Sequence, residues 1–317
     1  MIDSRITRLA PSPTGALHLG NARTFLVNWL LARQHGWSIV LRIEDLDGPR
    51  IKPGAAEEAI KDLCWLGLDF DVGPIVQSRH RERHRAAIET LLAKGCAFPC
   101  TCTRSEIERA ASAPHADDGA TIYPGTCRGR FDSVDHARNE SGREPAIRFR
   151  VDDHQIIRWQ DGFAGEQAIV LGSLGDFVIA KGDGTPSYQL AVVVDDAAEG
   201  VTHVVRGDDL LDSTPRQLLL SGALRLEPIH QYIHLPLVIG EDGRRLAKRH
   251  GDTRLSHYRE SGVAAGRVLR LLAQWCGIDA PHDIDSPHEL LPRFDLNQLP
   301  HDRIVMTNRD DALLRLP

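Results

Sequence analysis

A turn rich in proline and glycine carries the first residues whose types could do chemistry. The stretch APSPTGALHLGNARTF, residues 10–25, places His18 between a strand-like run and a helix-like run. The start of a helix offers free N–H groups and a positive dipole end, which suit a phosphate, and Gly20 allows close backbone approach. An imidazole at His18, flanked by Asn21, could stabilise charge that develops on a phosphate during displacement. By itself, a His-x-Gly pattern is more typical of a tight turn with a surface histidine.

Two charged features far along the chain could complete such a site. The stretch GEDGRRLAKRHGD, residues 240–252, is basic and bracketed by glycines, so Lys248 beside Arg245 could close over phosphates. Glu44 ends the buried run LRIE, where a carboxylate can hold an ammonium group. Residues 241–270 contain eight Lys or Arg and four Asp or Glu, against a net charge of −6 for the whole chain. Such a local basic strip favours binding to a defined polyanion, although a solvated helical face fits the charge equally well.

A cluster of cysteines follows in the middle of the chain. Cys100 and Cys102 lie one residue apart, and Cys127 comes 25 residues later. Three thiolates and one nitrogen or oxygen donor would make a tetrahedral zinc site. Chemistry alone favours His115 as the fourth ligand, with Cys96 as another contender. The alternative is a group of buried free cysteines.

The elements that must position these residues alternate between strand and helix. Residues 5–10 and 38–45 are predicted strands, and residues 54–67 and 78–94 are predicted helices. After the turn, Ala22, Phe25, Leu26, Trp29 and Leu30 recur at the spacing of an amphipathic helix. This order predicts an α/β fold with a parallel sheet covered by helices.

The alternation stops at residue 96 and resumes near residue 172. We therefore expect a catalytic core in two halves, residues 1–95 and 172–235, separated by an insertion over residues 96–171. Residues 236–317 should form a basic loop and a small helical domain, with one helix over 257–278. No apolar run could span a membrane, and the N-terminus lacks an apolar signal core, so a cytoplasmic monomer without a membrane partner is expected.

Three motifs together resemble the class I aminoacyl-tRNA synthetases, and the glutamyl group closely. RLAPSPTGALHLGN (8–21) is similar to the first signature of that family, RIEDLD (42–47) to the strand that follows it, and RRLAK (244–248) to its lysine loop. Ala247 and Arg249 depart from the usual loop. The resemblance implies a Rossmann-like nucleotide-binding core that joins glutamate to ATP with Mg²⁺, giving glutamyl-adenylate and pyrophosphate. His18 and Lys248 would be catalytic, and ATP would be bound by His18, Gly20, Asn21, Arg245 and Lys248.

The same resemblance implies a glutamate pocket and a ligand set for zinc. Glu44 would hold the α-amino group, and two arginines at strand ends would hold the carboxylates. The implied pocket residues are Arg8, Leu9, Ala10, Pro11, Ser12, Glu44, Tyr188 and Arg206. For one structural zinc ion the resemblance favours Tyr123 as the fourth ligand with Cys100, Cys102 and Cys127.

The length after the lysine loop bears on the acceptor of the glutamate. Only 69 residues follow Lys248, which we expect to be too few for an anticodon-binding domain. This length resembles the short glutamyl-queuosine tRNA(Asp) synthetases, and it implies transfer of glutamate to the queuosine base in the anticodon stem-loop of tRNA(Asp). The alternatives are a glutamyl-tRNA synthetase that charges a 3′ end, and a zinc-containing RNA-binding paralogue without catalysis.

Overall fold

The first half of the chain builds a parallel sheet with helical connections. The computed structural model describes residues 5–111, 122–152, 154–244, 246 and 252–315. The order is β1 (Ile6–Leu9), α1 (Leu19–His35), β2 (Ser38–Ile43), α2 (Ala55–Trp65), β3 (Val72–Val76) and α3 (Arg81–Ala93). Strand β2 pairs in parallel with β1 on one side and with β3 on the other. The predicted parallel α/β arrangement is therefore confirmed.

A second sheet continues the first. Its order is β7 (Gly165–Val170), β6 (Ile156–Asp161), β10 (Gln231–Leu235) and β9 (His203–Gly207), and β9 and β10 run parallel. The start of β9 lies beside β1, because the backbone N–H of Thr202 donates to the carbonyl of Ile6 at 2.9 Å. The carboxyl ends of β1 and β9 thus meet where the connections diverge to either side, the usual position of a ligand site in such sheets.

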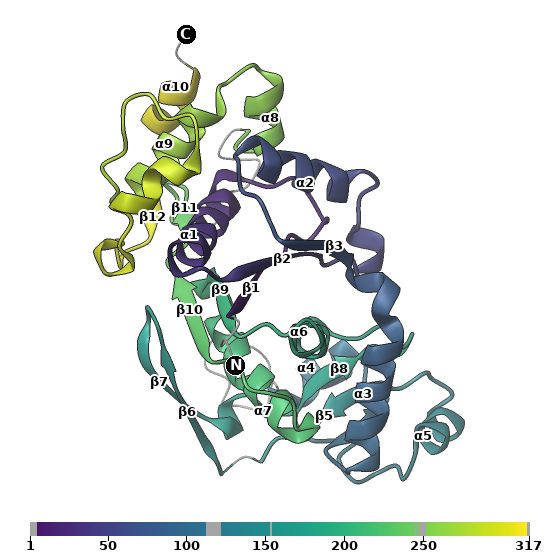
Figure 1. Ribbon diagram of the computed structural model, residues 1–317. Coiled ribbons are helices and arrows are strands. Elements are labelled where there is room, and N and C mark those ends of the chain that lie inside the picture. Colours follow the sequence, from purple (N-terminus) through teal and green to yellow (C-terminus); the bar gives the residue numbers. More distant parts are fainter. Residues whose placement is uncertain (1–4, 112–121, 153, 245, 247–251, 316–317) are drawn as a thin grey trace.

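The region predicted as an insertion supplies strands to both halves of the molecule. Strands β4 (Ala97–Cys100) and β5 (Ala146–Phe149) form an antiparallel sheet with β8 (Phe177–Ala180), while the hairpin β6–β7 joins β10. Two short helices, α4 (Arg104–Ala111) and α5 (Val134–Ser141), lie between these strands in the sequence. In Figure 1 this teal region occupies the lower part of the molecule, next to α3.

The remaining helices cover the core and form the C-terminal end. Helix α6 (Tyr188–Ala198) precedes β9, and α7 (Thr214–Leu224) follows the short 3-10 segment Asp208–Ser213. The last part has β11 (Val238–Ile239) paired with β12 (Ile304–Val305), and helices α8 (Leu255–Glu260), α9 (Ala265–Trp275) and α10 (Asn308–Arg315). The prediction of one helix over 257–278 is wrong, because Gly262 adopts φ 79° and separates α8 from α9.

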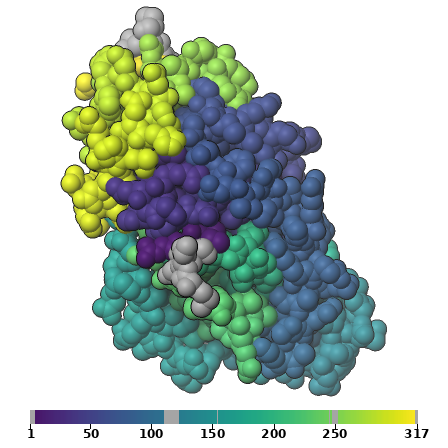
Figure 2. Space-filling view, in the orientation of Figure 1, coloured from purple at the N-terminus to yellow at the C-terminus, as the bar shows by residue number. Residues whose placement is uncertain are grey.

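Helix α1 is the centre of the main hydrophobic core. Leu19, Leu26, Trp29 and Leu30 are fully buried, and α1 contacts both β9 and α9. The C-terminal part therefore packs directly on the helix that begins at His18. Figure 2 shows this part in yellow at one end of the molecule and the teal region at the other. Among the described residues, no helix is both long and apolar enough to cross a membrane.

Candidate active site

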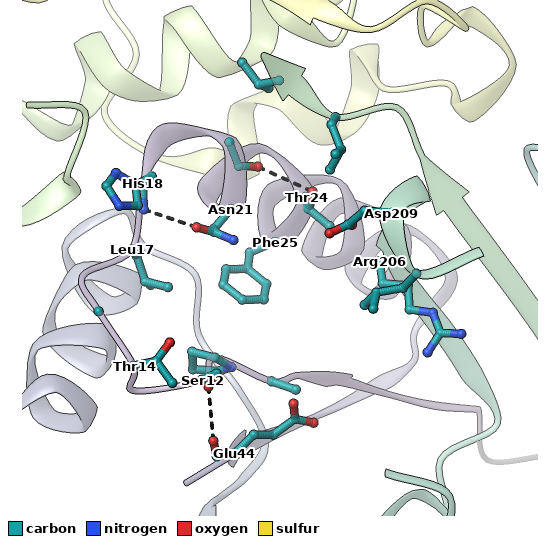
Figure 3. A pocket seen from close by; sticks show the side chains of 18 of the residues that line it. Ser12, Thr14, Leu17, His18, Asn21, Thr24, Phe25, Glu44, Arg206 and Asp209 are labelled. Atoms are coloured by element: carbon teal, nitrogen blue, oxygen red, sulfur yellow. Dashed lines mark hydrogen bonds between the residues drawn. The ribbon is translucent and has the colours of Figure 1, made fainter. Parts of the chain in front are cut away.

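A pocket of about 540 Å³ lies at the junction of β1 and β9, a size typical of small-ligand sites. It is lined by residues of the first turn, by Glu44 after β2, by Tyr188 at the start of α6 and by Arg206 and Gly207 at the end of β9. Figure 3 shows Ser12 and Glu44 on one side of the pocket and His18 and Asn21 on the other.

The structure brings together most of the side chains that the sequence implied. The predicted residues that line this one pocket are Arg8, Ala10, Pro11, Ser12, His18, Gly20, Asn21, Glu44, Tyr188 and Arg206. Leu9 is fully buried in the main core and is not among the lining residues, because successive side chains of a strand point to opposite faces. Arg245 and Lys248, with Ala247 and Arg249, lie outside the described residues.

The start of α1 is tied to the segment that follows the basic loop. The Nδ1 atom of His18 lies 2.9 Å from the hydroxyl of Thr253, which is itself buried. The backbone N–H of Leu19 donates to the Thr253 carbonyl at 3.0 Å, and that of Leu255 donates to Leu17 at 2.8 Å. On its other side, the Asn21 side chain accepts from the His18 backbone at 3.3 Å. These contacts fix the imidazole at the helix start and place the chain after the loop directly against it.

A cluster of arginines and carboxylates lies behind one wall of the pocket, where Arg8 and Glu44 are lining residues. Arg42 is fully buried and lies 3.2 Å from Glu44, 2.8 Å from Asp196 and 2.7 Å from Glu199. Arg8 is 4% exposed and lies 3.5 Å from the same Asp196. Glu199 also pairs with Arg83 at 3.0 Å, and Arg83 pairs with Asp195 at 2.6 Å. The guanidinium groups of Arg8, Arg42 and Arg83 thus face one more carboxylate than their own number, which leaves an excess of negative charge behind this wall. Such an excess suits an ammonium group of a ligand.

Glu44 is the carboxylate of this cluster that lines the pocket. Its side chain is 13% exposed. Burial raises the pKa of Glu44, and the positive charges of Arg42 and Arg8 act in the opposite direction. Burial also works against the charge of Arg42, but the carboxylates of Asp196, Glu44 and Glu199 raise the pKa of Arg42 well above its ordinary value. Arg42 therefore remains a cation at every pH at which the protein would act.

Arg206 meets the pocket from the opposite wall in a neutral surrounding. Its Nε, Nη1 and Nη2 atoms donate to His234 Nε2 at 2.9 Å, Gln217 Oε1 at 2.8 Å and Thr214 Oγ1 at 2.9 Å. Arg206 is 5% exposed, and no carboxylate of the described residues lies within ion-pair distance of it. A buried guanidinium without an anionic partner is costly by itself and favourable once an anion binds.

Several lining residues were missed by the sequence reasoning. The pocket also includes Thr14, Thr24, Phe25, Asp209, Leu210 and Leu237. Gly207 leaves little space there, since a Cβ atom at this position would lie 2.6 Å from Asp209 Oδ1 and 2.8 Å from Leu237 Cδ2. The acidic run directly after the strand at residues 203–207 was a usable signal, because ligands bind at the carboxyl ends of parallel strands.

The second candidate site is the cysteine cluster beyond β4. The sulfur atoms of Cys100, Cys102 and Cys127 all lie within 4.8 Å of one another. The Tyr123 hydroxyl lies 3.4 Å from Cys100 Sγ and 3.8 Å from Cys102 Sγ. Four donors therefore converge on one point, with separations that tetrahedral ligands about 2.3 Å from a zinc ion would have. The Cys96 thiol lies outside this cluster, next to the Lys94 carbonyl, and His115 lies outside the described residues.

The ionisable groups of this cluster are affected by burial and by a neighbouring arginine. Burial raises the pKa of the Cys102 thiol to about 12 and also raises the pKa of the Tyr123 phenol. The Arg148 side chain packs with its guanidinium carbon 4.0 Å from the centre of the Tyr123 ring, and its Nε lies 3.3 Å from Cys100 Sγ. A divalent ion would reverse the cost of ionising these buried donors.

The amino-acid sequence matches the model of a known family, in agreement with the fold and the pocket. The family model "tRNA synthetases class I (E and Q), catalytic domain" matches residues 5–305, and the chain belongs to this family of ligases.

Individual relatives of this chain carry more specific names than the family. A protein named Glutamyl-Q tRNA(Asp) synthetase from Symbiobacterium thermophilum is 48% identical over 94% of this chain and 94% of its own length. One of the same name from Nocardia farcinica is 47% identical over 97% and 94%. Glutamate--tRNA ligase 2 from Halorhodospira halophila is 41% identical over 93% of this chain and 62% of its own length. The crystal structure of a glutamate tRNA ligase from Elizabethkingia meningosepticum matches 97% of this chain and 68% of that one, with 28% identity and a TM-score of 0.82.

Proposed function

We propose that this protein activates glutamate with ATP to glutamyl-adenylate and then transfers the glutamate to the queuosine base of tRNA(Asp). The activation of glutamate is supported by one observation: a single pocket offers negative charge for an ammonium group and guanidinium groups for carboxylates. An excess of carboxylates around Glu44 suits the ammonium group of an amino acid, and Arg8 and Arg206 suit its two carboxylates. Glutamine would leave one buried guanidinium without an anion.

The roles in activation follow from this geometry. The α-carboxylate of glutamate attacks the α-phosphate of ATP, the bond to the β-phosphate breaks, and pyrophosphate leaves. His18 at the start of α1 would stabilise the negative charge on the phosphate oxygens, with Gly20 and Asn21 beside it and with Arg245 and Lys248 from the basic loop. Synthetases of this class use Mg²⁺ with ATP, and that ion would neutralise charge on the phosphates. Catalysis is then positioning plus electrostatics, without a covalent enzyme intermediate.

The acceptor is argued from the relatives. Both proteins named Glutamyl-Q tRNA(Asp) synthetase match this chain over 94% of their length and at 47–48% identity, above the 41% of the glutamate--tRNA ligase. We infer the same acceptor here, an anticodon stem-loop of tRNA(Asp) that carries queuosine. The acyl group would pass from the adenylate to this base, and AMP would leave.

We also propose one structural zinc ion in the cysteine cluster. Cys100, Cys102, Cys127 and Tyr123 would hold it, in agreement with the convergence of these four donors. When bound, the ion would join the segment after β4 to the chain around Cys127.

The decisive experiment separates the two possible acceptors. Purified protein is incubated with ATP, labelled glutamate and queuosine-containing tRNA(Asp) whose 3′-terminal adenosine has been removed enzymatically, which leaves the diol of the queuosine base intact. Transfer to this shortened tRNA is expected, since the queuosine base does not need the terminal ribose. Transfer only to tRNA(Glu) with an intact 3′ end would show a glutamyl-tRNA synthetase instead. Absence of glutamate-dependent exchange between ATP and pyrophosphate would refute activation altogether.

A further inference from the structure

A buried chain of three side chains connects the β6–β7 hairpin to the glutamate side of the pocket. Asp161, the last residue of β6, lies with Oδ2 2.6 Å from Nδ1 of His234 on β10. The Nε2 atom of the same imidazole accepts from Nε of Arg206 at 2.9 Å. The side chains of Asp161 and His234 are fully buried, so this chain is shielded from water.

The direction of the hydrogen bonds determines the state of His234. Because the guanidinium of Arg206 can only donate, Nε2 must be the acceptor and the proton must sit on Nδ1, facing Asp161. The charged groups that act on the ring are Asp161, Arg206 and, as a smaller contribution, Arg8. The Thr214 hydroxyl lies 3.3 Å from Nε2, and Tyr232 is stacked beside the ring. Burial lowers the pKa of His234, with the positive charge of Arg206 acting in the same sense, so the ring stays neutral.

Asp161 is itself held firmly by the backbone. Its Oδ1 atom accepts from the N–H groups of Phe163 at 3.0 Å, Ala164 at 2.9 Å and His234 at 3.1 Å. These bonds stabilise the ionised carboxylate and lower the pKa of Asp161, against the effect of burial. A fixed anion therefore holds the His234 proton on Nδ1 and the lone pair on Nε2 toward Arg206.

The remaining donors of Arg206 match a carboxylate. A guanidinium has five N–H groups, and His234, Gln217 and Thr214 engage one on each of its three nitrogens. One N–H therefore remains on each terminal nitrogen, the number that a bidentate carboxylate contact needs. The plane of the guanidinium is set by its three partners. Gln217 is oriented in turn by its amide N–H bond to Gln189 at 3.2 Å, and His234 is the partner whose protonation state depends on a carboxylate, that of Asp161.

We propose that Asp161 and His234 are positioning residues that make Arg206 selective for the carboxylate of glutamate, and that the β6–β7 hairpin is thus part of the amino-acid site. This inference rests on the proposed function. If His234 carried its proton on Nε2 instead, two N–H groups would face each other and Arg206 would rotate away from the pocket.

The test uses two substitutions of His234 that separate its two contacts. The amide oxygen of His234→Gln reaches the position of Nε2 and keeps an acceptor for Arg206. The shorter side chain of His234→Asn reaches only the position of Nδ1, toward Asp161. We expect the KM for glutamate in pyrophosphate exchange to stay within about threefold of wild type in His234→Gln and to rise about 10- to 100-fold in His234→Asn. The KM for ATP should stay unchanged in both.

Asp161→Asn completes the test, with Asp176→Asn as its matched control. Asp176 is a buried carboxylate that accepts from Arg128 and from the Val151 backbone and does not line the pocket. Asp161→Asn should raise the KM for glutamate about 10- to 100-fold and reduce the preference for glutamate over glutamine. Asp176→Asn should lower the melting temperature without changing the KM for glutamate.

Calorimetric binding of glutamate without ATP keeps this inference distinct from the proposed function. If the wild type binds glutamate but exchanges no pyrophosphate, the proposed function fails and the dissociation constants of the same variants still test the positioning role. Equal dissociation constants for His234→Gln and His234→Asn, or an unchanged one for Asp161→Asn in a folded variant, would overturn the inference. A parallel rise in the KM for ATP would overturn it as well, because it would indicate general disorder of the pocket. A wild type that binds no glutamate refutes both proposals.

Discussion

Replacing Glu44 by glutamine tests the amino-group side of the pocket with little change of shape. Glu44 faces the pocket beside a buried cluster in which Arg8 and Arg42 meet three carboxylates, and the substitution removes the excess negative charge. Two unit charges about 4 Å apart attract by roughly 4 kcal/mol at an effective dielectric constant of about 20. The amide oxygen of glutamine still accepts a hydrogen bond from the ammonium group, so part of this attraction is retained. We therefore expect kcat/KM for glutamate to fall by about 30- to 1,000-fold, which corresponds to roughly 2–4 kcal/mol.

The fold should survive this substitution, so the loss can be assigned to the site. Because burial raises the pKa of Glu44, the folded protein holds the proton more tightly than the unfolded chain does, and the ionised carboxylate costs folding free energy at neutral pH. The neutral amide removes that cost, and Glu44→Gln should melt no lower than wild type at pH 7.

The assay is glutamate-dependent pyrophosphate exchange as a function of pH, with Glu58→Gln on α2 as the control. The wild-type rate should fall on the acid side above the ordinary carboxyl range near pH 4.3, as Glu44 takes up its proton, and the Glu44 variant should lack this limb. The reasoning is refuted if the variant retains kcat/KM within about twofold of wild type, or if the control loses as much activity.

Three further outcomes are expected. Arg8→Ala should reduce glutamate-dependent exchange at least about a hundredfold while the protein stays folded, because Asp196 keeps its contact with Arg42 at 2.8 Å; near-normal exchange would contradict the assignment of Arg8 to the pocket. Metal analysis should find one zinc per chain in the wild type and none in Cys102→Ser, and a zinc-free wild type would exclude the metal site. Burial raises the pKa of Asp62 to about 6, so the folded state binds more protons than the unfolded state between about pH 4 and 6, and the free energy of unfolding should fall as the pH rises through that window. Asp62→Asn should remove the contribution of this group to the slope and add about 3 kcal/mol at pH 7, and denaturant unfolding with an unchanged slope would refute it.

Local patterns were sufficient for the elements around the first turn. The alternation of residues 5–10, the helical stripe from Ala22 and the buried run ending at Glu44 each appear as the strand or helix that they predicted. These signals are strong because each element has one face or the whole of its surface in the core. The helix over 257–278 failed for a local reason as well, since Gly262 takes a backbone conformation that ends α8.

Pairings between distant segments were beyond the sequence. Nothing in residues 156–161 indicates that they pair with β10, and this pairing is what brings Asp161 against His234. Cys96 could not be separated from the other cysteines by spacing, whereas its thiol lies apart from them in space. In both cases the outcome depends on which chains meet after packing, and no local periodicity encodes that.

The sequence by itself determined the chemistry available to this protein: a helix start with His18, a carboxylate at Glu44, arginines at two strand ends and clustered thiols. Residue types and short spacings carry this information, because capping, strand ends and metal-donor chemistry are local properties. The tertiary structure alone decided which charges are compensated. Arg8 meets Asp196, while Arg206 is surrounded by neutral acceptors and keeps its charge for a ligand. That difference arises from packing between distant segments, because the free energy of a buried charge depends on every segment that surrounds it.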